Sequence, residues 1–128
     1  MSRSLSRETV FKLVYEYTVN KEVNKDTIES FNDGKVDMEY VNKVYFGVVE
    51  NFDSLVQEIS NFSKGFSENR IFKVDLSIML IAVYEIKYMP EIPNAVSINE
   101  AVNLAKSYST EKSFGFINGI LSNFVKKA

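Results

Sequence analysis

Residues 95–121, with the sequence AVSINEAVNLAKSYSTEKSFGFINGIL, decide the fold of this chain. The stretch predicts two short amphipathic helices in tandem. Ser97 followed by Glu100 fits a capping box, in which two side chains satisfy backbone N–H groups at a helix start. A second helix is expected to begin near Ser109 or Thr110. The apolar positions recur at three- and four-residue steps, as on one helical face: Ile98, Ala101, Val102, Ala105 and Tyr108, then Phe114, Ile117, Ile120, Leu121, Phe124 and Val125.

Small residues in this stretch predict a close contact between helices. Ala101, Ala105 and Gly119 would let two backbones approach, although Gly119 costs about 1 kcal/mol of helix propensity relative to Ala. A bulky residue at position 119 is therefore expected to destabilise the protein by several kcal/mol, roughly the upper range for overpacking. The neighbouring Asn118 is expected to be buried, with its amide bound to backbone in the 93–97 link.

The first half of the chain also shows helical periodicity. A first helix is expected from Ser4 or Ser6, with Val10, Leu13, Val14 and Tyr17 as its apolar face. A short helix after Asp26 should end at the Asn-Asp-Gly turn of 32–34. A long run then opens at Asp37 and ends near Lys64–Gly65. Asp53 is a good cap that could divide this run in two.

A further helix is predicted over 73–88, and it is apolar around much of its circumference. Such a helix is typical of the centre of a domain. Pro90 and Pro93 should close it and force an extended link to Ser97. The chain as a whole therefore predicts an all-α protein of about seven helices.

Composition indicates a binding protein and argues against an enzyme. The 128 residues suit one domain, and 45% hydrophobic with 25% charged residues is ordinary for a globular protein. With no Cys and no His, the chain lacks thiolate chemistry, the usual general base and the commonest metal ligand. The glycines fit no phosphate-binding loop. We expect no cofactor and no metal.

The chain carries no predicted membrane segment. No apolar run approaches the roughly 18 residues of a spanning helix, and the N-terminus does not resemble a signal peptide. A cytoplasmic location is expected.

Charge is distributed unevenly along the chain, although the net charge is only −2. Residues 1–25 hold five Lys/Arg against three Asp/Glu, and residues 94–128 hold four against two. The middle, 26–93, holds six against twelve. If the two ends meet in space, the molecule has a mildly basic side and an acidic one.

The ordered set of motifs resembles the NusB family of transcription antitermination factors. The resemblance is carried by SINEAV at 97–102 running into LAK at 104–106, and by FINGIL at 116–121. Arg70-Ile71, Val74-Asp75 and IAVYEI at 81–86 match the family's preceding core helix, and Arg7-Glu8 with Leu13 and Tyr15 matches its first helix. The similarity covers nearly the whole chain. It implies two packed helical subdomains, with separate helices on either side of 51–53.

The resemblance also implies a function and its partners. Family members bind boxA-like single-stranded RNA of nascent ribosomal transcripts together with a small basic ribosomal protein, NusE, and so act on the transcription elongation complex. In the family, the N-terminal arm and the last two helices face RNA, and the middle helices face the protein partner. The charge distribution suits both assignments. A possible homodimer, a helical protein–protein interaction module with the same fold and little RNA affinity, is the alternative.

Six residues are candidates for these surfaces. Arg3 and Arg7 lie four residues apart, so both would point the same way on a helix, and guanidinium groups suit phosphate. The expected RNA-binding residues are Arg3, Arg7, Lys106, Lys112 and Phe114; the expected partner-binding residue is Asp75. Asp75 could instead contact the N-terminal dipole of its own helix.

Three aromatic positions are also informative. Phe114 and Phe116 are two apart on a helix, so both cannot face one core, and one is expected to be available for base stacking or a dimer. Tyr84 beside Glu85 could form an aromatic–acid site. The pattern favours a core position for Tyr84 and a capping or bridging role for Glu85.

Overall fold

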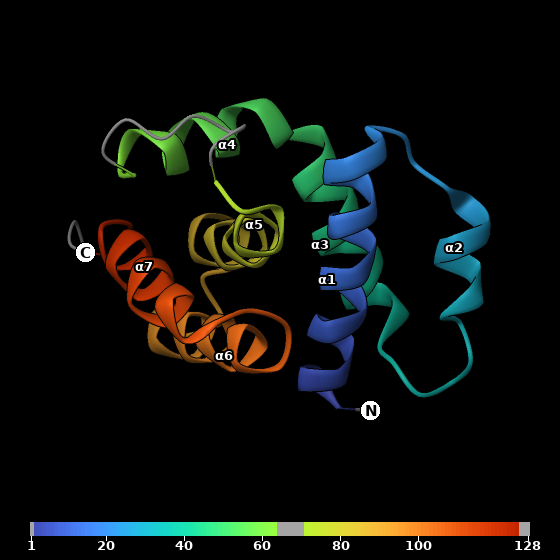
Figure 1. Cartoon of the computed structure of the whole chain (residues 1–128). Coiled ribbons are helices and arrows are strands. Elements are labelled where there is room, and N and C mark those ends of the chain that lie inside the picture. The colour runs from blue at the N-terminus through green and yellow to red at the C-terminus, as the bar shows by residue number, and fades with distance from the viewer. Residues whose placement is uncertain (1, 64–70, 126–128) are drawn as a thin grey trace.

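The computed structural model describes residues 2–63 and 71–125, which form an all-α structure. Within these residues there are seven helices and no strand (Figure 1). They are α1 (Arg3–Asn20), α2 (Lys25–Ser30), α3 (Met38–Glu50), α4 (Phe52–Asn61), α5 (Lys73–Tyr88), α6 (Asn94–Tyr108) and α7 (Glu111–Ser122). The predicted fold class is confirmed.

Helix α5 lies at the centre of the molecule. It packs against α1 and α3 on one side, against α6 and α7 on the other, and against α4 (Figure 1). Its bounds agree with the helix predicted over 73–88, and every residue from Asp75 to Glu85 is buried, so the helix is covered around its whole circumference. The helices on either side of α5 form the two packed helical subdomains that the family resemblance implies.

Two helix starts lie at predicted capping residues. Asp37 accepts hydrogen bonds from Glu39 N (3.1 Å) and Tyr40 N (3.3 Å) and caps α3. Thr110 occupies the cap position of α7. Helix α1 begins slightly earlier than expected, because Ser2 Oγ accepts a hydrogen bond from Leu5 N (3.1 Å).

The long run from Asp37 does divide into two helices, but Asp53 is not the cap. Asn51 holds the cap position, and Asp53 lies in the first turn of α4, where its charge favours the helix N-terminus. Helix α4 ends at Asn61. The end predicted at Lys64–Gly65 falls outside the described residues.

The capping box predicted at Ser97 and Glu100 is wrong. Helix α6 already begins at Asn94, directly after Pro93, whose fixed φ of −59° is compatible with a helix start. Ser97 therefore lies inside α6 and is buried, and its Oγ donates to Glu85 Oε1 at 2.7 Å. The hydroxyl that looked like a cap instead binds a carboxylate of α5.

The close helix contact predicted at Gly119 is also wrong. Helix α7 turns Ile117, Ile120 and Leu121 into the core, so Asn118 and Gly119 lie on its exposed side. A Cβ at Gly119 would meet no atom of the described residues within 4 Å. The close approach is at Gly47 of α3, where a Cβ would collide with the Tyr84 ring.

Candidate nucleic-acid interface

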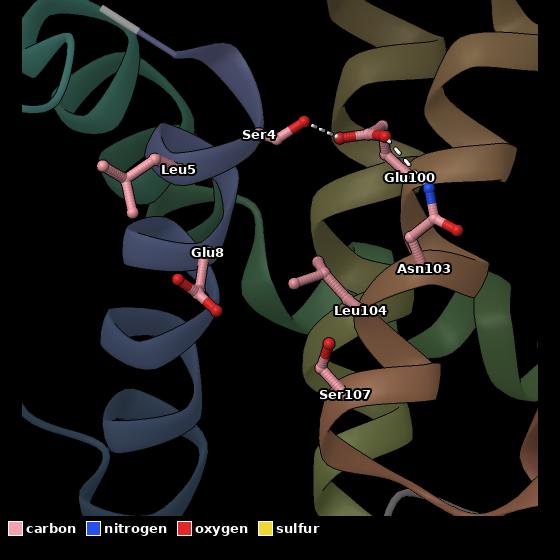
Figure 2. Close-up of a pocket in the computed structure, with 7 residues that line it drawn as sticks. All are labelled: Ser4, Leu5, Glu8, Glu100, Asn103, Leu104 and Ser107. Atoms are coloured by element: carbon pink, nitrogen blue, oxygen red, sulfur yellow. Dashed lines mark hydrogen bonds between the residues drawn. The ribbon is translucent and has the colours of Figure 1, made fainter.

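The two basic ends of the chain meet in space. Ser4 Oγ of α1 donates to Glu100 Oε1 of α6 at 2.7 Å, and Tyr108 Oη donates to Glu8 Oε2 at 2.6 Å. Figure 2 shows the groove between α1 and α6 and the Ser4–Glu100 hydrogen bond that joins the two helices. Its walls include two carboxylates, those of Glu8 and Glu100. This groove is therefore a poor place for a phosphate, despite the basic balance of the segments that form it.

Arg7 is not a surface residue, contrary to the sequence-based expectation. It is only 5% exposed. Its Nε donates to Glu85 Oε2 at 2.8 Å, its Nη2 to Glu85 Oε1 at 3.2 Å, and its Nη1 to Glu100 Oε1 at 3.4 Å. Such a bidentate pair satisfies the hydrogen-bonding capacity of a buried carboxylate. Direct RNA contact by Arg7 stays an untested prediction, and its burial argues against it.

Glu85 is the centre of this buried polar cluster. Besides Arg7, its carboxylate accepts hydrogen bonds from Tyr40 Oη of α3 and Ser97 Oγ of α6. Burial raises the pKa of the Tyr40 phenol far above its ordinary value, and the adjacent Glu85 carboxylate raises it further. The phenol is thus held protonated as a donor. The expected bridging role of Glu85 is confirmed, and Tyr84 beside it lies in the core at 8% exposed.

Arg3 is the arginine of the N-terminal turn that reaches solvent. Its guanidinium lies 4.2 Å from the centre of the Tyr40 ring and 3.9 Å from Asp37 Oδ2. Its side chain remains 45% exposed. A cation over an aromatic face is attracted to the ring, and its exposed part can still bind an anion. The RNA contact expected of Arg3 stays a prediction.

A second groove lies between α6 and α7 and contains two of the expected RNA-binding residues. It encloses about 620 Å³ and is lined by Asn99, Val102, Asn103, Lys106, Phe114, Gly115 and Asn118. Lys106 is exposed and Phe114 is half-buried. Asn103 also lines the α1–α6 groove, so the two grooves adjoin at α6. The core position expected for Asn118 is wrong, and the sequence did not predict Asn99 or Asn103 as site residues.

Lys112 is exposed at the start of α7, beyond the turn that follows Lys106. The two aromatic side chains of α7 diverge: Phe114 lines the α6–α7 groove, and Phe116 lines a separate groove with Phe62, the residue directly after α4. Both are half-buried and pack against the core, so neither is the fully exposed ring that the spacing suggested.

Asp75 does not lie on the surface. It is 4% exposed, and its carboxylate accepts hydrogen bonds from Ser109 Oγ (2.6 Å) and Ser113 Oγ (2.7 Å). These contacts join the first turn of α5 to the α6–α7 turn. The expected surface position was wrong, because serines far along the chain cover the carboxylate. The partner-binding role stays a prediction. A buried Asp75 would affect partner binding only indirectly, by holding the α6–α7 turn in position.

Two structural features concern other classes of function. Among residues 2–63 and 71–125, no group of His, Cys, Asp and Glu is arranged to hold a metal ion. No helix in the same part of the chain has the length and apolar character needed to cross a membrane.

Comparison with known proteins decides the family. A model of the NusB family matches residues 4–126. This chain belongs to the NusB family. It is 44% identical over 131 residues to the transcription antitermination protein NusB of Finegoldia magna, covering 99% of this chain and 96% of that protein. It is 43% identical to the NusB protein of Acetivibrio thermocellus, covering 98% of this chain and 90% of that one.

Solved structures of the NusB fold agree with this assignment. NusB of T. maritima superposes with a TM-score of 0.90 at 30% identity, covering 99% of this chain and 92% of that chain. A chain in a crystal structure described as a plectonemic RNA supercoil gives 0.86 at 27% identity, covering 98% and 94%. The helices of this NusB-family chain are therefore arranged as in T. maritima NusB.

Proposed function

We propose that this chain is a transcription antitermination factor that binds boxA-like single-stranded RNA of nascent ribosomal transcripts together with a small basic ribosomal protein, NusE. The observation that carries the proposal is the similarity over nearly its full length to NusB antitermination proteins. The role is that of an adaptor on the transcription elongation complex and involves no catalysis.

The side chains around the α6–α7 groove support the RNA part of the proposal. Lys106 and Lys112 present exposed ammonium groups near the groove and its turn, and Phe114 presents part of an aromatic ring. Single-stranded RNA is commonly bound by such a combination of cations for phosphates and rings for bases. Arg3 adds an exposed guanidinium at the other end of the chain.

The surface of the middle segment supports the protein part of the proposal. Exposed carboxylates there include Glu50 and Asp53, on either side of the α3–α4 junction. Opposite charge steers the encounter of a basic protein with an acidic surface. Because Asp75 is buried, these exposed residues replace it as candidates for direct contact.

One observation favours the alternative of a protein–protein module. The burial of Arg7 leaves Arg3 as the exposed arginine of the first helical turns. A single guanidinium contributes little salt-dependent affinity, since each phosphate contact on single strands changes the log–log salt slope by about 0.7. Strong RNA binding by the isolated protein is therefore not expected.

A titration of labelled boxA RNA tests the proposal. The RNA is titrated with this protein, with the purified ribosomal protein, and with both together, each at two salt concentrations. We expect weak, salt-sensitive binding by this protein alone and much tighter binding by the pair. If the pair binds RNA no better than the ribosomal protein alone, the antitermination proposal fails. Self-association under the same conditions, without RNA binding, would support the homodimeric module.

A further inference from the structure

Two positions in this chain place Asn or Asp directly before Gly: Asp33-Gly34 and Asn118-Gly119. In such pairs the backbone nitrogen of the glycine can attack the side-chain Cγ of the residue before it and close a five-membered succinimide ring. Glycine favours this attack because no side chain shields its nitrogen. An amide is a better electrophile than an ionised carboxylate, so the sequence by itself ranks Asn118 as the more reactive of the two.

Helix α7 protects Asn118 from this reaction. Asn118 lies inside the helix, and ring closure would have to rotate its ψ away from the helical value of about −42°. The N–H of Gly119 takes part in the hydrogen-bond ladder of the helix. The carbonyl of Gly119 accepts hydrogen bonds from Ser122 Oγ at 2.9 Å and Asn123 Nδ2 at 3.1 Å. Ring closure at Asn118 therefore requires local unwinding of α7.

The turn between α2 and α3 leaves Asp33 unprotected. Asp33 and Gly34 are both exposed. Gly34 has a φ of +83°, and a Cβ at this position would meet no atom of the described residues within 4 Å. Within residues 2–63 and 71–125, the N–H of Gly34 donates no hydrogen bond. The attacking nitrogen is therefore free, and the ring has room to form.

The carboxyl group of Asp33 already lies next to that nitrogen. Its Oδ1 accepts a hydrogen bond from Lys35 N at 3.0 Å, which folds the carboxyl group back over the Gly34 peptide. The turn follows a helix of only six residues, and Figure 1 shows α2 and this turn at the edge of the molecule, away from α5. Such surface loops rearrange without opening the packed core. The turn can therefore reach the ring-closing conformation while the protein stays folded.

We propose that Asp33 is a site of spontaneous isomerisation to isoaspartate, and that the fold directs this modification to Asp33 and away from Asn118. A bond forms between Gly34 N and Asp33 Cγ, the Cγ–OH bond breaks, and the amide proton leaves with the hydroxyl group as water. Water then hydrolyses one of the two ring carbonyls. When it adds to the main-chain carbonyl of Asp33, the chain continues through Cβ and Cγ, and residue 33 is isoaspartate.

Isomerisation changes the backbone and leaves the charge as it was. The main chain between α2 and α3 gains one carbon atom, and a carboxylate remains at residue 33. Val36, which is buried, and Asp37, which caps α3, follow the turn and anchor the chain. The change is therefore confined to the turn. It is independent of the proposed function, since it uses none of the residues assigned to RNA or to the protein partner.

Incubation of the folded protein at neutral pH tests the site. Samples are digested with trypsin, which separates Asp33 and Asn118 into the peptides 26–35 and 113–126. Isoaspartate is measured by methyl transfer from labelled S-adenosylmethionine with an isoaspartyl methyltransferase, and deamidation is measured by mass spectrometry. We expect isoaspartate to accumulate in peptide 26–35. Incubation in heavy-oxygen water, followed by digestion in ordinary water, should add heavy oxygen to that peptide, because the ring is opened by water.

The same incubation in guanidinium chloride supplies the comparison with an unfolded chain. There the order of the two sites should reverse, with Asn118 reacting faster than Asp33. In the folded protein Asn118 should react at least about tenfold more slowly than in the unfolded chain, since α7 must first open locally and each factor of ten corresponds to about 1.4 kcal/mol.

Asp33→Glu is the matched control. It keeps the negative charge, but closure would need a six-membered ring, so the isoaspartate of peptide 26–35 should disappear. Because Asp33 is exposed, thermal melts of this variant and wild type should agree.

Three results would overturn the proposal. Deamidation of Asn118 ahead of isomerisation of Asp33 in the folded protein would mean that α7 gives no protection. Absence of isoaspartate at Asp33 in the folded protein, whether or not the unfolded chain forms it, would mean that the turn prevents ring closure. Persistence of isoaspartate in Asp33→Glu would assign the modification to another residue of the same peptide.

Discussion

Arg7 is a cationic residue that the fold removes from solvent. Viewed along the first helix, Arg3 and Arg7 are equivalent, since they share a face. In the folded protein, Arg3 lies over Tyr40 at the surface, while Arg7 is enclosed by carboxylates of α5 and α6. A buried ion pair is costly to disrupt, because removing one partner leaves an uncompensated charge.

Arg7→Ala should therefore act on stability. We expect the free energy of unfolding to fall by about 3–5 kcal/mol, since Glu85 would remain buried without its cation. Chemical denaturation followed by circular dichroism measures this change. Arg3→Ala is the matched control and should cost less than about 1 kcal/mol, as for an exposed pair. Equal effects of the two changes would contradict the buried pair.

Arg3→Ala should instead act on RNA binding. With the ribosomal partner present, we expect weaker binding to boxA RNA and a log–log salt slope lower by about 0.7, the value for one phosphate contact on a single strand. Titrations at several salt concentrations give the slope. An unchanged slope would exclude Arg3 from the RNA surface.

Replacing the glycine of α7 and replacing the glycine of α3 should have opposite effects on stability. Gly119→Ala should stabilise the protein by up to about 1 kcal/mol, because Ala is the better helix former and no atom in the described part of the chain lies within 4 Å of its Cβ. Gly47→Ala should destabilise it by about 1–3 kcal/mol, because the Cβ would collide with the Tyr84 ring. Thermal melts of both variants check this. Loss of stability in Gly119→Ala would restore the close contact that the small residues had suggested.

The first turn of α5 is connected to the α6–α7 turn through Asp75. Asp75→Asn should lower the free energy of unfolding by about 1–3 kcal/mol, because one of the two serine hydroxyls would lose its acceptor. In a double-mutant cycle with Ser113→Ala the two losses should not add, since both remove the same contact. Additive losses would mean that this contact contributes little.

At the scale of the whole molecule, the Glu85 cluster joins helices that are far apart in sequence. Tyr40 of α3, Arg7 of α1 and Ser97 of α6 all bind this one carboxylate of α5. The cluster thus ties the helices on both sides of α5 to each other. Its tyrosine makes this connection sensitive to alkaline pH.

Stability should fall as the pH rises above about 10, the ordinary pKa of tyrosine. Burial raises the pKa of Tyr40, so the folded state keeps its proton after the unfolded chain has lost it. The unfolded state then binds fewer protons, and stability falls by up to about 1.4 kcal/mol per pH unit for each such group. Tyr40→Phe should make the fall shallower, as measured by urea denaturation between about pH 8 and pH 11.

Tyr45→Phe is a useful comparison in the same experiment. Burial raises the pKa of Tyr45 to about 12, so this change should also reduce the alkaline loss. Its hydroxyl has no hydrogen-bond partner among the described residues, so stability at neutral pH should hardly change. Tyr40→Phe should cost about 1.5–3 kcal/mol at neutral pH, because it removes a hydrogen bond to a charged group. An identical alkaline loss in wild type and both variants would exclude these tyrosines as its source.

Local sequence determined the helices and the family of this protein. The apolar period predicted α5 at its observed bounds, and Asp37 and Thr110 marked two helix starts. These features depend on residues within a turn or two of each other, so they are readable from a short window. The family resemblance likewise rests on ordered short motifs. The RNA and partner surfaces, by contrast, were predicted by analogy with the family.

Only the tertiary structure decided which polar residues are buried. Arg7 meets Glu85 across 78 positions of sequence, and Ser113 meets Asp75 across 38. Asn118, which looked like a core amide, faces a groove. A polar side chain is stable inside a protein only where a partner from elsewhere satisfies it. No periodicity within one helix contains that partner, so burial of Arg7 and exposure of Asn118 became visible only once distant helices were packed together.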